Sequence, residues 1–475
     1  MTPTAPELDG SRRTKLVIAL PAVFLAGAAL LWWMVWPGNP IDSAPIVGSC
    51  LWWLALLMVV KLLANVPRHR LGVVIMAGSL LLGLMAASAP PRTSNDSARY
   101  AWDGIVQKAG ISPYSYVPTD ETLNNLRPDW LFAPGAAGAG GSPACPPELF
   151  GTESVPATGF PSGDPLCTAI NRPYAPTIYP PTAEVYFLVV RAAVPDSVGY
   201  LPMQLGGLLI SSAVTLMLLR VLDRRKMPLQ LAVVWAWSPL VMLEAVNNAH
   251  VDVLGAALLL LAGMFLVGGK PLGSGVAFGA AVATKFIPVI AAPALLFRRP
   301  VRFVVAAVAT FLALYVPYLV VAGPAVLGFL PGYLKEEGYS QGGGIRFGLA
   351  QLVSVGIWPA VLSAAVLAIV ALVVLKRSNA RSMWTQQTVM IGLTLLIISP
   401  NYPWYSLMLL PFIVLSRRWE YLAVILALGF IYMVPKPVQY AGPINQSALL
   451  AAAAILMAAA WLRRRHELEQ TLPHE

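Results

Sequence analysis

The composition excludes a soluble globular fold and indicates a membrane protein. Of the 475 residues, 57% are hydrophobic and 11% are charged, whereas soluble domains carry about 25% charged residues. The 32 Lys and Arg residues outnumber the 22 Asp and Glu residues, which gives a formal net charge of +10. In a membrane protein this excess is expected to contact anionic lipid, so it does not call for a nucleic-acid partner.

Hydrophobic runs with few charged residues recur along the chain. Inside a bilayer such a run must satisfy its own backbone, and these runs lack the alternation that a barrel strand requires. We therefore expect an all-α polytopic membrane protein with about 11–13 transmembrane helices. The runs lie at about 16–36, 44–65, 71–90, 201–219, 229–246, 251–268, 272–297, 301–322, 352–375, 386–400, 402–416, 419–435 and 444–462.

Clusters of Lys and Arg predict which side of the cell membrane each connection faces, because cytoplasmic connections retain positive charge. This assignment places the N- and C-termini in the cytoplasm. It places two polar insertions, 91–200 and 323–351, on the extracytoplasmic side, where we expect the functional site. The basic clusters lie at 12–15, 68–70, 220–226, 298–302, 376–381, 417–418 and 463–465.

The first outer loop begins with a predicted amphipathic helix that ends at Gly110 and is able to lie in the membrane interface. Cys145 and Cys167 are the two cysteines on this side, and the oxidising environment there favours a disulfide between them. Two free thiols are the alternative. Cys50 lies in a hydrophobic run, where we expect it to pack in the core. No Cys or His spacing is typical of a structural zinc site.

Asp96 and Asp103 are candidate catalytic bases near the start of this loop. They are seven residues apart, about two helical turns, so a helix would present them on one face. A carboxylate at the membrane surface can accept a proton from a substrate hydroxyl. The alternative is that Asp96 only caps the helix. Tyr100 and Trp102 are either interface anchors or a platform for a substrate.

The stretch EAVNNAHVDVLG concentrates polar side chains at the outer end of a helix pair. The bilayer penalises such groups, so they must face protein, water or a ligand. A tight turn rich in Asn and Asp is the alternative, but five polar side chains exceed what such a turn requires. These side chains are Glu244, Asn247, Asn248, His250 and Asp252.

The segment 272–297 has basic residues at both ends, although it is long enough for one crossing. Lys285 lies at its centre, and Pro288 interrupts helical hydrogen bonding three residues later. We expect this segment to enter from the cytoplasm, to break near Lys285 and to return. The lysine would then face an interior cavity.

Two further outer segments carry candidate residues. The second outer loop, 323–351, contains Arg346, a triple glycine and the charged run 335–337, which are typical of a lid or simply of a solvated loop. The stretch SPNYPWYS at 399–406 breaks a helix with two prolines and presents three aromatic rings. An aromatic belt at the membrane interface is the alternative for these rings.

Five stretches, taken in order, resemble the actinobacterial polyprenyl-phosphomannose-dependent mannosyltransferases of the GT-C superfamily. They are NDSARYAWDGIVQKAGISPYSYVP, INRPYAPTIYPPTAEVYF, WSPLVMLEAVNNAHVDVLGAALLL, GVAFGAAVATKFIPVIAAPALL and SPNYPWYSLMLLP. The resemblance implies a GT-C-type glycosyltransferase that acts on the extracytoplasmic side. The donor implied is polyprenyl phosphomannose, although arabinose, glucose or another sugar would use the same architecture. We expect the acceptor to be a hydroxyl of a cell-envelope glycan or glycolipid, and a protein hydroxyl is the alternative.

The resemblance also implies roles for particular residues. Such enzymes place a catalytic aspartate directly after an outward-running helix, and Asp96 matches that position. His250 and Asp252 match the histidine–acid motif of the family, although Val251 stands where relatives often carry Asn. The GT-C-like module would span 67–435, followed by a final transmembrane helix and a basic cytoplasmic tail in 436–475. Residues 1–66 would add an extra pair of transmembrane helices at the front.

The expected chemistry is a single displacement that inverts the anomeric centre. The phosphate leaves without protonation, so one base suffices, and no cofactor is expected. No paired acidic motif marks the outer face, so no metal is expected either. Lys285, Arg346 and Arg99, in that order, are candidates to bind the phosphate. We expect His250, oriented by Asp252, to bind the phosphate or the sugar. The candidates for sugar or lipid contacts are Tyr100, Trp102, Tyr179, Asn247, Asn248, Tyr402, Trp404 and Tyr405.

A carrier or flippase for a lipid-linked sugar is the alternative function. It would also need a membrane cavity and a buried cation. Transporters often show repeated halves, however, and this sequence has no convincing internal repeat. The long outer loop also suits acceptor binding better than transport.

Overall fold

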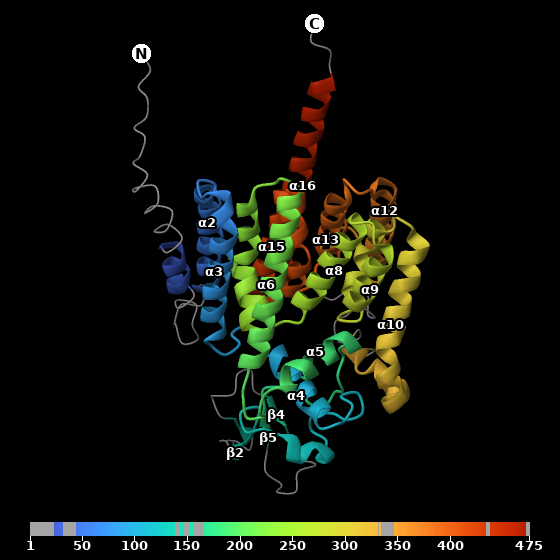
Figure 1. Cartoon of the computed structure of the whole chain (residues 1–475). Coiled ribbons are helices and arrows are strands. Elements are labelled where there is room, and N and C mark those ends of the chain that lie inside the picture. Colours follow the sequence, from blue (N-terminus) through green and yellow to red (C-terminus); the bar gives the residue numbers. More distant parts are fainter. Residues whose placement is uncertain are drawn as a thin grey trace.

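The structure is a computed structural model of the whole chain, and it describes residues 23–31, 44–137, 143–145, 153–155, 166–330, 332–333, 346–433 and 438–471. Figure 1 shows a body of roughly parallel helices with a smaller lobe at one end. The lobe is formed by the chain between α3 and α6, which is the first predicted outer loop. The described part of the chain is therefore mostly helical, as the sequence predicts.

The body contains long helices together with short ones. Its α-helices are α2 (Ala44–Leu63), α3 (Arg68–Ala87), α6 (Leu201–Arg224), α7 (Val233–Ala236), α8 (Asp252–Val267), α9 (Pro271–Val282), α10 (Pro300–Ala322), α12 (Trp358–Arg377), α13 (Met383–Ile398), α14 (Leu410–Ser416), α15 (Leu422–Met433) and α16 (Val438–Thr471). Short 3₁₀ helices are η2 (Leu229–Ala232), η4 (Ile287–Leu295), η5 (Gly323–Leu327), η6 (Ala350–Leu352), η7 (Pro403–Met408) and η8 (Trp419–Tyr421), and η3 (Val241–Asn247) is a π-helix.

Six helices of the described residues are long and apolar enough to cross a membrane, or seven if a pair bent by 58° counts as one span. This confirms an all-α polytopic membrane protein. Several predicted runs instead fold as shorter apolar helices, because prolines and polar side chains interrupt them. The long spans are Ile46–Leu63, Arg68–Ala87, Leu201–Arg224, Pro300–Leu327, Trp358–Arg377 and Tyr440–Glu467, and the bent pair is Leu229–Ala236 with Val241–Asn247.

The predicted break at Lys285 divides the segment 272–297 into two pieces. The helix α9 ends at Val282, and η4 begins at Ile287. The two ends of the segment lie together, since a Cβ built on Gly269 would be 3.3 Å from Arg298 Nη2. The chain therefore enters the body from one side and returns to that side.

The lobe packs two helices against small sheets. The helices α4 (Asp96–Lys108) and α5 (Pro181–Ala192) pack together, and a 3₁₀ helix, η1 (Glu121–Leu126), follows α4. A Cβ on Gly104 would lie 2.5 Å from the carbonyl oxygen of Phe187, so only glycine allows this close approach. The strands are β1 (Phe132–Pro134), β2 (Ala136–Ala137), β3 (Pro143–Ala144), β4 (Glu153–Val155) and β5 (Leu166–Thr168), paired antiparallel in the orders β1-β5-β4 and β2-β3.

The helix α4 is a buried element rather than an interfacial one. Residues 97–106 are all buried, between α5 and the sheet side of the lobe. The alternation of polar and apolar residues in this helix was equally compatible with a position in the membrane interface. Burial of both faces shows that the lobe encloses the helix, which fixes the position of every side chain on it.

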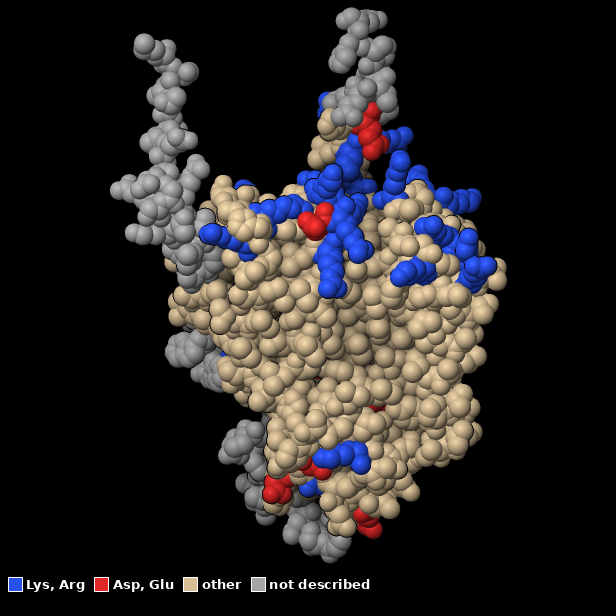
Figure 2. All heavy atoms as spheres, in the orientation of Figure 1, with Lys and Arg blue, Asp and Glu red and all other residues tan. Residues whose placement is uncertain are grey.

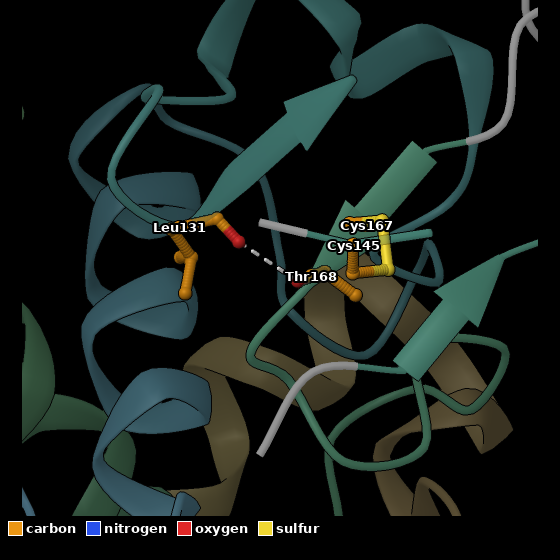
Figure 3. Close-up of a disulfide and its surroundings, with 4 residues drawn as sticks. All are labelled: Leu131, Cys145, Cys167 and Thr168. Atoms are coloured by element: carbon orange, nitrogen blue, oxygen red, sulfur yellow. Dashed lines mark hydrogen bonds between the residues drawn. A yellow bond between two sulfur atoms is a disulfide. The ribbon is translucent and has the colours of Figure 1, made fainter. Parts of the chain in front are cut away.

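The structure joins Cys145 and Cys167 in a disulfide (Figure 3). Next to it, the hydroxyl of Thr168 donates a hydrogen bond of 3.0 Å to the carbonyl oxygen of Leu131, which ties β5 to the segment before β1. Cys50, in contrast, is exposed on α2 rather than packed in the core as expected. A lipid-facing thiol is as compatible with an apolar run as a buried one, so the sequence could not separate these two positions.

Lys and Arg gather at one end of the molecule, the end opposite to the lobe (Figure 2). The ion pair between Arg68 and Asp223 and the contacts of Arg463 and Arg418 with Glu420 belong to this end. The two ends of the body are thus electrostatically different, which is the pattern that a fixed orientation in a membrane produces. We call this end the basic end.

We predict that replacing Cys145 and Cys167 by Ser destabilises the lobe locally by about 3 kcal/mol, because the disulfide closes a loop of 22 residues. Limited proteolysis of the purified protein, with and without reductant, measures this effect. Cys50→Ser is the matched control and should leave the digestion rate unchanged. Equal digestion of all variants would contradict the prediction.

Candidate functional site

A cavity of about 490 Å³ lies where the lobe meets the helical body. Its wall is formed by the start of α4, the segment 171–180, the break before η4, the residues around Tyr333, and the aromatic turn at η7. Sequence segments more than 300 residues apart therefore share one space. The predicted site residues on its wall are Asp96, Arg99, Tyr179, Lys285, Tyr402, Trp404 and Tyr405.

Asp96 is the first residue of α4, and its carboxylate faces the cavity. Asn171 Nδ2 donates a hydrogen bond of 2.9 Å to Asp96 Oδ1, and 17% of the Asp96 side chain is exposed. The residue before it, Asn95, occupies the N-cap position, so Asp96 is not the helix cap that the alternative interpretation proposed. The N-terminus of α4 favours a negative charge at this position.

His250 lies behind Asp96, between two carboxylates. Its Nδ1 is 3.5 Å from Asp96 Oδ2, and its Nε2 is 3.3 Å from Glu244 Oε2. The imidazole is fully buried and stacks on Trp404, with 3.8 Å between the ring centroids. Each ring nitrogen thus faces a carboxylate, although neither contact has hydrogen-bond geometry in this structure.

The backbone explains how Glu244 reaches His250. The π-helix η3 ends at Asn247, and Ala249 then adopts a left-handed conformation with a φ of 54°. This turn brings the amide of His250 back to donate a hydrogen bond of 2.9 Å to the carbonyl oxygen of Glu244. The sequence indicated that Glu244 is one of several polar side chains here, but not that it pairs with His250. A π-helix has no clear sequence signature, which is why the pairing was missed.

Asp252 does not orient His250, contrary to our expectation. It begins α8, and its carboxylate binds Lys285 Nζ at 2.9 and 3.1 Å. Lys285 lies at the break before η4, and its ammonium is 4.6 Å from the ring centroid of Tyr405. The two residues of the predicted motif thus serve different partners, because the chain turns between them. The Asp252–Lys285 pair joins α8 to the returning segment.

Arg99 and Asp103 form a buried ion pair one turn apart on α4. Arg99 Nε lies 2.9 and 3.1 Å from the two carboxylate oxygens of Asp103, and its Nη1 donates to the carbonyl oxygen of Ala175. Arg99 reaches the cavity wall, whereas Asp103 does not. Asp103 shares a helix face with Asp96 but sits about 10 Å further along. Its position is that of a partner for Arg99 rather than a catalytic base.

Glu184 of α5 completes a buried network around this pair. Thr177 Oγ1 donates to Glu184 Oε1 at 2.6 Å, and Gln107 Nε2 donates to Glu184 Oε2 at 2.8 Å. Burial, and then the negative charge of Asp103, raise the pKa of Glu184 well above its ordinary value. Burial also raises the pKa of Asp103, but the charge of Arg99 opposes that effect. Burial therefore raises the pKa of both carboxyl groups, and for Asp103 the charge of Arg99 is the largest opposing effect.

Tyr100 and Trp102 do not reach the cavity, although both were expected to contact a sugar or lipid. Tyr100 is fully buried and stacks on Phe187, with 4.6 Å between ring centroids. Trp102 is 1% exposed and packs edge-on against Phe132. Both rings face the interior of the lobe, because α4 is covered on both faces. They support the helix that carries Asp96.

Asn247 and Asn248 were also expected to contact the substrate, but they bind backbone groups, and Asn248 also donates to Thr93 Oγ1 and Glu244 Oε2. Asn247 Nδ2 donates to the carbonyl oxygens of Ala86, Ala89 and Pro90, at 3.0 to 3.1 Å. The side-chain oxygens of both residues accept from the amide of Arg92, at 3.1 Å. Both side chains are fully buried. They hold the segment that leads from α3 into α4.

Arg346 lies near the aromatic turn but not on the cavity wall. It is 2% exposed, and its guanidinium carbon is 5.5 Å from the ring centroid of Tyr402. Tyr402 in turn stacks on Trp404, with 4.6 Å between centroids. The charged run 335–337 of the predicted lid lies outside the described residues.

The wall also includes residues that had not been singled out from the sequence, among them Asn171, Arg172 and Tyr333. Arg172 adopts a left-handed φ of 61°, and its guanidinium carbon lies 5.6 Å from the ring centroid of Tyr333. In the sequence, the proline directly after Arg172 in the stretch INRP indicated a restricted backbone at this residue. Arg172 adds a third basic side chain to the wall, beside Arg99 and Lys285.

The model of glycosyltransferase family 87 matches residues 177–400. This range covers a little under half of the chain and includes Glu244, His250 and Lys285. Asp96 and the aromatic turn at η7 lie outside it. No curated protein and no solved structure shows significant similarity to the chain.

We predict that Glu184→Gln weakens the pH dependence of stability. Because the pKa of Glu184 is raised in the fold, its stabilising contribution is complete below the ordinary glutamate pKa and is lost as the pH rises through the raised value. Glutamine cannot ionise, so the difference in Tm between about pH 5 and about pH 9 should shrink.

Thermal unfolding of the purified variants measures this difference. Glu121→Gln, at an exposed position on η1, is the matched control and should behave as the wild type does. A Glu184→Gln variant whose Tm varied with pH as the wild type does would show that Glu184 is ionised in the fold.

Proposed function

We propose that this chain is a membrane glycosyltransferase of the GT-C type that transfers a sugar, mannose in the first instance, from a polyprenyl-phosphate donor. The acceptor is a hydroxyl of a cell-envelope glycan or glycolipid. The observation that carries this proposal is the cavity itself, which sets the carboxylate of Asp96 across from Lys285 at the edge of the membrane-spanning body. A donor with a lipid tail, an anionic phosphate and a sugar needs the membrane-spanning body, the cation of Lys285 and the carboxylate of Asp96 in one place.

In the proposed reaction Asp96 is the general base. The acceptor oxygen attacks the anomeric carbon on the face opposite the phosphate, and its proton passes to Asp96. The bond between the anomeric carbon and the phosphate oxygen breaks, so polyprenyl phosphate leaves with the electron pair and the anomeric centre inverts. Asn171 holds one oxygen of Asp96 by a hydrogen bond of 2.9 Å, which directs the carboxylate into the cavity.

Three basic side chains on the wall are candidates to stabilise the phosphate. Lys285 is preferred, because its ammonium is held at the cavity by Asp252 and the ring of Tyr405. Arg99 and Arg172 are the others. Arg346, which the sequence also suggested, is more remote, since Tyr402 lies between it and the cavity. The rings of Tyr179, Tyr402, Trp404 and Tyr405 remain our candidates for sugar or lipid contacts.

We further propose that the basic end faces the cytoplasm, with both termini, and that the lobe and the cavity are extracytoplasmic in the cell membrane. The charge distribution in Figure 2 supports this orientation. The disulfide in the lobe supports it independently, since disulfides persist on the oxidising side of a membrane.

We predict that Asp96→Asn lowers kcat by about 10²–10⁴-fold, the usual contribution of a general base. The assay measures release of polyprenyl phosphate from polyprenyl phosphomannose in membranes that contain extracted glycolipid acceptor. It is run in excess chelator, because we also propose that no divalent metal is required. Asp129→Asn, at an exposed position of the lobe, is the matched control and should retain full turnover.

Three outcomes would contradict the proposal in different ways. Equal turnover by Asp96→Asn and the wild type would move the base elsewhere. Turnover that appears only when metal is restored would refute the metal-free mechanism. Movement of the donor across the membrane without release of polyprenyl phosphate would show a carrier rather than a transferase.

We predict that His250→Phe lowers kcat by about 10–100-fold while Tm changes little. Phenylalanine can keep the stack on Trp404 but has no ring nitrogen to face Asp96 and Glu244. The loss of one interaction with a charged group corresponds to about this factor. Parallel measurements of kcat and Tm test the prediction. A fall in Tm with unchanged kcat would make His250 a packing residue only.

A further inference from the structure

A second cavity, of about 810 Å³, lies between α2, α15 and α16. Its wall is almost entirely apolar, with Trp53, Leu240 and Phe430 among the larger side chains. The carboxylates on its wall are those of Glu244 and Glu420. Glu420 pairs with Arg463 at the basic end, at 2.8 Å. This cavity, which we call the apolar groove, therefore runs along α15 from the basic end toward the lobe.

The apolar groove meets the candidate active site at its other end. Thr93 lies on the walls of both cavities, three residues before Asp96. Pro403 lines the groove, and the next residue, Trp404, lines the active-site cavity. Tyr432 of α15 also lines the active-site cavity, and its hydroxyl donates to the carbonyl oxygen of Thr93. The two cavities thus share a narrow boundary of backbone and aromatic side chains.

The groove is also open to the membrane on its side. Leu426 and Phe430 of α15 and Ile455 of α16 line it, and all three are exposed at the surface of the body. Exposed apolar side chains at this depth face lipid tails rather than water. A molecule already dissolved in the bilayer can therefore enter the groove laterally, without passing through either aqueous phase.

We propose that the apolar groove holds the isoprenoid tail of the polyprenyl-phosphate donor, a proposal that rests on the function proposed above. The donor needs a long apolar channel that ends where a phosphate can meet cations, and the groove ends beside the cavity that contains Lys285. The released polyprenyl phosphate must leave after each turnover, which the lateral opening allows. Since α2 forms one wall, the assignment also gives the N-terminal helices a function.

Gly429 offers a way to fill the groove without disturbing the fold. It lies on the groove wall in α15, and a Cβ at this position would meet no atom within 4 Å. Gly429→Phe should therefore place a ring in the groove. Gly72→Phe in α3 is the matched control, because Gly72 is equally unobstructed but does not line the groove.

The experiment compares two donors that carry the same sugar, one on a long-chain polyprenyl phosphate and one on methyl phosphate, which has no tail to enter the groove. We expect Gly429→Phe to raise KM for the long-chain donor about tenfold, and to leave KM for the methyl phosphate donor within about twofold of the wild type. Gly72→Phe should leave both values unchanged. An equal effect of Gly429→Phe on both donors, or none on either, would overturn the assignment of the groove.

A readout without turnover uses Cys50, the one cysteine of the three outside the disulfide, which lines the groove. Long-chain polyprenyl phosphate should slow alkylation of Cys50 in purified protein, whereas inorganic phosphate and added phospholipid should not. Equal protection by phospholipid would show a general lipid site and overturn the proposal.

The two proposals fail in distinguishable ways. If the wild type turns over no polyprenyl-phosphate sugar, the proposed function fails. The assignment of the groove to the donor tail then fails as well. If the wild type turns over the donor but Gly429→Phe affects the donors with and without a tail equally, only the groove assignment fails.

Discussion

The position of the candidate base depends on a few amide side chains that satisfy backbone groups at the edge of the membrane. The chain between α3 and α4 is neither helix nor strand, and its carbonyl and amide groups need partners wherever water is excluded. Asn247, Asn248 and Gln204 supply them, since Gln204 Nε2 donates to the carbonyl oxygen of Ala89 at 2.8 Å. All three side chains are buried. These amides tie the segment before α4 to the helical body, while α5 and the sheets hold α4 itself.

The charged side chains of the site are paired with one another. Arg99 is matched by Asp103, Lys285 by Asp252, and the imidazole of His250 faces Asp96 and Glu244. Arg99 and Lys285 thus each have a fixed counter-ion, which offsets the cost of burying their charges. Asp96 and Glu244 each contact an amide side chain and the imidazole of His250, but 17% of the Asp96 side chain is exposed, against 1% of Glu244. Among the carboxylates of the described residues, that of Asp96 is the one on the wall of the active-site cavity.

The sequence could predict the elements that depend on local chemistry. The break at Lys285 followed from a lysine and a proline within an apolar run, and the place of Asp96 at the membrane edge followed from the end of that run. The partners of these residues could not be predicted in the same way. Asp252 and His250 are two residues apart, yet a left-handed turn and a helix start send them to different neighbours. In the sequence, Tyr100 and Trp102 resemble interface anchors. In the structure, α5 and the sheet cover them.

The returning segment formed by α9 and η4 has a consequence for the sidedness of everything that follows it. A hydropathy count treats 272–297 as one crossing and therefore reverses the orientation of each later helix. A hairpin that goes in and comes back leaves the parity unchanged, so α10 begins on the side where α9 began. The second outer loop consequently emerges beside the lobe, where Phe329 donates its amide to the carbonyl oxygen of Thr177. One interrupted helix thus decides that both loops close over a single cavity.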